Sequence, residues 1–67
     1  MKNKDAQIPI NKIKKNQKYQ RQNKVLIWTV EEVDIMSRQI KLNPSNKTAA
    51  FWVQANNSIF KYKNLLN

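Results

Sequence analysis

The 67-residue chain contains no cysteine, no histidine and no glycine. The missing cysteines exclude disulfides and thiolate chemistry, and the missing histidines remove most zinc sites and the usual general base near neutral pH. No apolar run approaches the roughly 18 residues of a membrane span, and the basic N-terminus lacks the apolar stretch of a secretory signal. We therefore expect a non-enzymatic protein with no catalytic residues, no metal, no cofactor and no membrane contact. Its expected location is intracellular, in the nucleus or cytoplasm, or in the nucleoid of a bacterium.

Acidic residues are also scarce, since 4 Asp and Glu stand against 13 Lys and Arg, for a net charge of +9. Residues 1–24 hold eight basic residues against one acidic residue, a net +7, and residues 25–67 hold five against three, a net +2. Such an excess predicts attraction to polyanions. The expected partner is nucleic acid, with DNA favoured over RNA.

The charge distribution divides the chain into two expected parts. Residues 1–24 carry few apolar side chains and many long polar ones, so they are expected to bury too little surface to offset the entropy of ordering. They are predicted to form a basic arm, largely disordered when free. Residues 25–67 are predicted to form a small folded domain. Tyr62 and then Tyr19, each flanked by basic residues, are the best candidates for exposed aromatics.

A helix is predicted from about Val30 to Leu42. Thr29 and Glu32 have the spacing of a capping box, and Trp28 and Val33 that of a hydrophobic staple. Apolar residues then recur every three or four positions until Asn43-Pro44, where a proline ends helical geometry. The acidic residues at positions 31, 32 and 34 are interpreted as helix-start residues rather than catalysts.

Residues 47–64 allow two interpretations. As a helix, they place Trp52, Ala55 and Ile59 along one stripe. As a hairpin turning at Asn56-Asn57, they alternate equally well, although such turns usually contain the glycine that this chain lacks. The helix is favoured, and the fold class is predicted to be mainly α, of helix-turn-helix type. The alternative is a small α+β winged helix with a C-terminal hairpin.

The run Trp28-Thr29-x-Glu31-Glu32, with Trp52 and Ala55 further along, resembles the Myb or SANT repeat. In that family the tryptophans belong to the core and the third helix reads DNA. The same Thr29-Val30-Glu31-Glu32 start, followed by the segment from Trp52 to Lys63, is also similar to small winged-helix excisionases. Both resemblances imply binding to nucleic acid.

The candidate nucleic-acid-binding residues are basic side chains that neutralise phosphates and amides that pair with base edges. They are Lys12, Lys14, Lys15, Lys18, Arg21, Lys24, Lys47, Gln54, Asn57, Lys61 and Lys63. Neutralising the four lysines at positions 12, 14, 15 and 18 is expected to flatten the slope of log K against log salt by about three or four units. The alternatives are a structural component of a ribonucleoprotein such as a ribosome and an adaptor or inhibitor that docks on an acidic protein.

Overall fold

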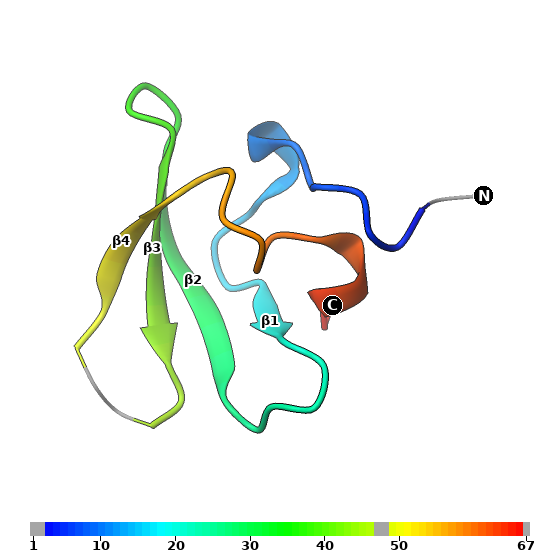
Figure 1. The fold of residues 1–67 in the computed structure, drawn as a ribbon. Helices are drawn as coiled ribbons and strands as arrows, with labels where there is room; N and C mark the ends of the chain where they lie inside the picture. The colour runs from blue at the N-terminus through cyan, green and yellow to red at the C-terminus, as the bar shows by residue number, and fades with distance from the viewer. Residues whose placement is uncertain (1–2, 47–48, 67) are drawn as a thin grey trace.

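The computed structural model describes residues 3–46 and 49–66. Its central feature is a four-stranded antiparallel sheet with strand order β1-β2-β3-β4 (Figure 1). The strands are β1 (Lys18–Gln20), β2 (Ile27–Asp34), β3 (Gln39–Pro44) and β4 (Phe51–Gln54). Two single 3-10 turns, η1 (Ile10–Lys12) and η2 (Tyr62–Asn64), complete the assigned elements. The protein is thus mainly β, and the predictions of a mainly α helix-turn-helix domain and of a winged helix are wrong.

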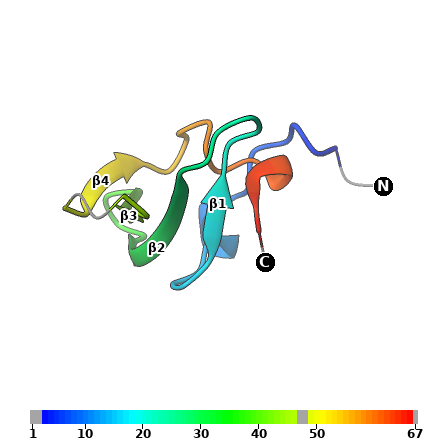
Figure 2. The ribbon, with the colours of Figure 1, turned by 90° about the horizontal axis from the view of Figure 1, so that it is seen from below.

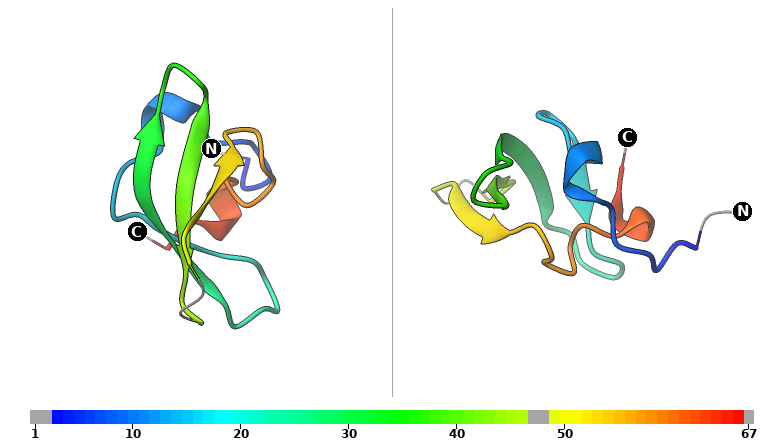
Figure 3. Two further views of the ribbon diagram at one scale, coloured as in Figure 1. Left: turned by 90° about the vertical axis from the view of Figure 1, so that its left-hand side faces the viewer. Right: turned by 90° about the horizontal axis from the view of Figure 1, so that it is seen from above.

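The segment predicted as a helix from Val30 to Leu42 is instead the β2–β3 hairpin (Figure 3). Residues 27–33 are rich in β-branched and aromatic side chains, which favour strands over helices. The helical spacing arose because apolar residues of two separate strands were counted as one series across the turn. Long-range pairing with β1, β3 and β4 therefore outweighs a local capping motif that never forms.

The hairpin turn explains Asp34 without a helix. Its Oδ1 accepts hydrogen bonds from the backbone N–H groups of Met36 and Ser37, at 3.1 and 3.3 Å. A hydrogen bond from the Ser37 side chain, together with these two backbone hydrogen bonds, lowers the pKa of Asp34. Arg38 closes the turn at φ 56°, the left-handed region that glycine would ordinarily occupy. Asn16 and Asn23 take the same conformation elsewhere, so this glycine-free chain builds its tight turns mainly from asparagine.

A bulge in β2 sets which side chains face the core. Val30 pairs with Leu42, but Glu32 pairs with Lys41, so Glu31 is the extra residue. The extra residue turns the Val33 side chain to the same face of the sheet as Val30. Cross-strand pairs on that face form the buried side of the sheet. At the bulge, the Asn43 side chain donates a 2.6 Å hydrogen bond from Nδ2 to Glu31 Oε2.

The C-terminal part of the chain is neither the predicted helix nor the predicted hairpin. β4 pairs with β3 in the register Leu42↔Phe51 to Gln39↔Gln54, and it has no partner among residues 55–66. The chain leaves the sheet after Gln54 and crosses to the β1 side, where Tyr19 and Leu65 form an isolated bridge (Figure 2). Adjacent asparagines and the missing glycine make a two-residue hairpin costly here.

The core draws on both ends of the chain. Ile8, Ile13 and Tyr19 are buried with residues of the sheet and with Ile59 and Phe60. Residues 4–8 run antiparallel to residues 60–63, joined by backbone hydrogen bonds such as Ile8 N to Phe60 O at 2.7 Å. The stretch predicted as a basic arm therefore contributes apolar anchors to the folded state. That this stretch is largely disordered in the free protein stays a prediction.

Tyr19, predicted as an exposed aromatic, is fully buried. Burial raises its pKa to about 12, and nearby Tyr62 adds to the shift. An unfolded tyrosine titrates near 10, so the stabilisation from a neutral Tyr19 is complete below about pH 10 and lost as pH rises toward 12. Between these pH values the wild type should lose on the order of 2 kcal/mol more stability than Tyr19→Phe. Urea unfolding at both pH values checks this, and parallel losses in the two proteins would contradict it.

Candidate nucleic-acid interface

Four of the predicted basic residues meet at one cavity of about 400 Å³. Arg21 and Lys24 come from the turn between β1 and β2, and Lys61 and Lys63 come from the segment around η2. Some forty residues of sequence separate the two pairs. The cavity, called here the cationic cavity, exists only because the C-terminal segment packs beside β1.

The β1–β2 turn holds its two basic residues by backbone geometry. Lys24 N donates to Arg21 O at 3.2 Å, and Asn23 supplies the positive φ of 64° that the turn requires. The Gln20 side chain donates from Nε2 to Lys24 O at 3.0 Å. The turn is therefore held by its backbone hydrogen bond and by the Gln20 side chain. The side chains of Arg21 and Lys24 are exposed.

Buried Asn64 shapes the opposite wall. Its Nδ2 donates to Ser58 O at 3.2 Å and to Ile59 O at 3.1 Å. A buried amide that satisfies two backbone carbonyls fixes the loop in one conformation. Lys61 occupies the N-cap position of η2 and Lys63 lies within η2, so Asn64 helps to hold the backbone that carries both lysines.

Among the described residues that line the cavity, none is acidic. Asp5 approaches from the N-terminal segment, and its Oδ1 lies 3.0 Å from Lys63 Nζ. The hydrogen bond and charge of Lys63 lower the pKa of that exposed carboxyl. An exposed ion pair contributes little to stability and exchanges readily with other ions. The cavity therefore keeps a strong local excess of positive charge.

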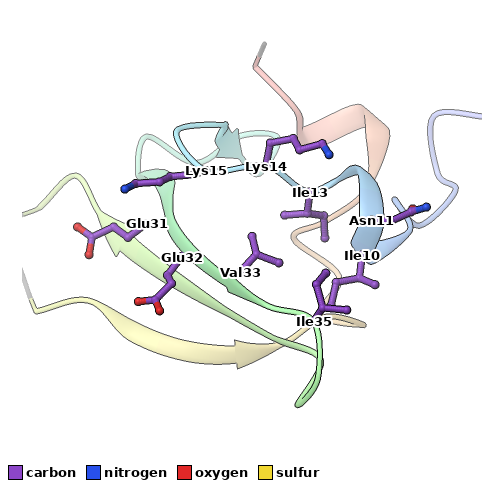
Figure 4. Close-up of a pocket in the computed structure, with 9 residues that line it drawn as sticks. All are labelled: Ile10, Asn11, Ile13, Lys14, Lys15, Glu31, Glu32, Val33 and Ile35. Atoms are coloured by element: carbon purple, nitrogen blue, oxygen red, sulfur yellow. The ribbon is translucent and has the colours of Figure 1, made fainter.

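Two other predicted lysines lie in a different environment. Lys14 and Lys15 line a groove of about 530 Å³ that Glu31 and Glu32 also line (Figure 4). Figure 4 shows Lys15 extending to the same side as both carboxylates and Lys14 extending to the opposite side, with Ile13 and Val33 between them. The two acids offset the two lysines, so this groove is a weaker site for a phosphate.

The other predicted residues that the structure describes do not line the cationic cavity. Lys18 Nζ lies 3.3 Å from Thr29 Oγ1 on the outer face of the sheet, and Lys12 is exposed at the end of η1. Gln54 lies with Arg38 at the far end of β4. Asn57 accepts hydrogen bonds at Oδ1 from Ile59 N and from Arg21 Nη2, at 2.9 and 3.3 Å. Lys47 lies outside the described residues.

Sequence reasoning missed four polar residues that complete the cationic cavity: Gln22, Asn23, Ser58 and Asn64. The asparagines were attributed to composition, because asparagine and lysine are enriched along the whole chain. A usable signal lay in position, since Asn64 stands between basic residues and an apolar pair. Only the fold shows that Asn64 is buried.

Within residues 3–46 and 49–66, no group of three or more acidic side chains is placed to hold a metal ion. No helix in the described part of the chain is long and apolar enough to cross a membrane. The comparisons with known proteins find no relative, because no protein-family model, no curated protein and no solved structure matches the chain significantly. Any function must therefore be argued from the site itself.

Proposed function

We propose that this protein binds the phosphate backbone of nucleic acid, without catalysing a reaction, through the cationic cavity. The observation that carries the proposal is the convergence of Arg21, Lys24, Lys61 and Lys63 on one cavity whose described lining contains no carboxylate. Like charges repel one another, so gathering them costs folding free energy. A polyanionic partner offsets that cost.

The mechanism is counterion release. Each phosphate that a lysine or arginine neutralises frees condensed cations from the nucleic acid, and the resulting entropy gain falls as salt rises. Arg21 adds a planar guanidinium that can hold two phosphate oxygens at once, whereas lysines act as point charges. Contacts of this kind position the polymer but carry no base sequence.

The groove beside η1 is a poorer candidate for the same role. Glu31 and Glu32 line it, and Glu31 is already engaged by Asn43. A phosphate entering there meets two carboxylates, whose repulsion offsets the attraction of Lys14 and Lys15. The lysines within residues 12–18 carry the higher charge density in the sequence. The four residues around the cavity are nevertheless the better candidates for phosphate binding.

The proposal is tested by titrating the protein against labelled single-stranded DNA, duplex DNA and folded RNA at several salt concentrations. We expect binding at low salt, with log K falling by about three to four units per unit of log salt, as expected for four phosphate contacts. Absence of binding to all three polymers at low ionic strength would refute the proposal. Salt-sensitive binding to an acidic protein alone would then favour the adaptor interpretation.

A further inference from the structure

A shallow aromatic groove adjoins the cationic cavity. Trp28, Phe51 and Val53 line it, it measures about 70 Å³, and Arg21 lines both hollows. The rings of Trp28 and Phe51 meet edge to face, with centroids 5.7 Å apart and planes at 90°. Phe51 nevertheless leaves 42% of its surface exposed. An aromatic ring therefore stands open to solvent beside a concentration of positive charge.

Arg21 is held at the boundary between the two hollows. Its Nη2 donates to Asn57 Oδ1 at 3.3 Å, and Asn57 is itself fixed by the backbone N–H of Ile59. Arg21 thus lines both the aromatic groove and the cationic cavity, and its guanidinium is anchored to Asn57 of the groove. One ligand that carries an anion and a flat apolar group side by side can occupy both hollows.

An unpaired nucleotide is such a ligand. Its phosphate is anionic, and its base offers a π face that stacks on aromatic side chains. In a duplex these faces are covered by neighbouring bases, so the ring of Phe51 gains nothing there. The groove is too small to enclose a base, which favours stacking over its open surface.

We infer, resting on the proposed function, that the ligand is a single-stranded nucleic acid whose base stacks on Phe51 while adjacent phosphates occupy the cationic cavity. Because the adjoining cavity is positively charged, we assign this anionic ligand to the largely apolar groove. Arg21 couples the two contacts because it lines both hollows.

Trp52 provides a matched comparison on the same strand. It follows Phe51 directly and is 41% exposed, but it points to the other face of the sheet. Phe51 pairs with Leu42 of the buried face, whereas Trp52 pairs with Lys41, which in turn pairs with Glu32. Two aromatic residues of equal exposure therefore differ in the charge around them.

The experiment compares Phe51→Ala, Phe51→Leu and Trp52→Ala with the wild type, using oligo-dT, oligo-U and inorganic polyphosphate as probes. Both Phe51 variants should bind the two oligonucleotides roughly fivefold to a hundredfold more weakly, the range for losing one stacked base. Polyphosphate carries no base, so its binding should stay unchanged. Trp52→Ala should match the wild type throughout. The oligonucleotide bound more tightly by the wild type shows whether DNA or RNA is the preferred ligand.

Phe51→Leu keeps an apolar side chain against Trp28, which guards against a loss of folding in the alanine variant. Unchanged oligonucleotide binding in both Phe51 variants would overturn the inference and leave the proposed function standing. An equal loss for polyphosphate, or an equal effect of Trp52→Ala, would overturn it as well. Failure of the wild type to bind any nucleic acid would instead refute the proposed function, and the inference with it.

Discussion

Replacing Arg21, Lys24, Lys61 and Lys63 together with glutamine is expected to flatten the slope of log K against log salt by about three units on a single strand. On a duplex the expected change is between three and four units, because each phosphate contact releases more counterions there. Glutamine keeps much of each side-chain stem, so the fold should survive. Fluorescence anisotropy at several salt concentrations measures the slope, and circular dichroism verifies the fold.

The matched control neutralises four lysines from the N-terminal part of the chain, at positions 12, 14, 15 and 18. It removes the same net charge, but two of these lysines share a groove with Glu31 and Glu32. Sequence reasoning expected this set to flatten the slope by three or four units, whereas the structure leads us to expect a smaller change. A larger effect from the control set than from the cavity set would reject the cavity as the binding site.

Phe60→Ala is expected to destabilise the protein by about 3–5 kcal/mol, the usual cost of truncating a buried phenylalanine. Phe60 is fully buried, its ring meets Tyr19 edge to face at 5.3 Å, and its backbone carbonyl accepts the 2.7 Å hydrogen bond from Ile8. A domain of this length has roughly 3–10 kcal/mol of stability in total. The variant should therefore be largely unfolded near 37 °C, as thermal unfolding followed by circular dichroism would show.

Met36→Ala is the control for this substitution, since Met36 lies at the tip of the β2–β3 turn with 95% of its surface exposed. Its effect should stay within about 0.5 kcal/mol. Similar unfolding temperatures for the two variants would mean that Phe60 does not hold the N-terminal and C-terminal segments together. Binding at the cationic cavity should fall with folding in Phe60→Ala, because Lys61 and Lys63 follow Phe60 directly.

The structure gathers part of the predicted set of basic residues at one cavity. Arg21, Lys24, Lys61 and Lys63 were all named from charge alone, and the fold brings these four together. Charge along the sequence could not separate these four from Lys14 and Lys15. Glu31 and Glu32 are distant from those two lysines in sequence and share a groove with them only in the fold. The exposure of Phe51 could not be predicted from the sequence, because it depends on β4 being an edge strand of the sheet.

Composition by itself determined the excess of positive charge and, through the absence of cysteine and histidine, the exclusion of thiolate and imidazole chemistry. Tertiary structure decided the fold class. The Thr29-x-x-Glu32 motif and the apolar spacing after it satisfy a helix locally, but the fold pairs Val30 and Val33 with β3 and buries Val30 in the core of the sheet. Tertiary structure also decided the location of the site, because a cavity between a turn at residues 21–24 and a segment at 58–64 depends on contacts that no local pattern encodes.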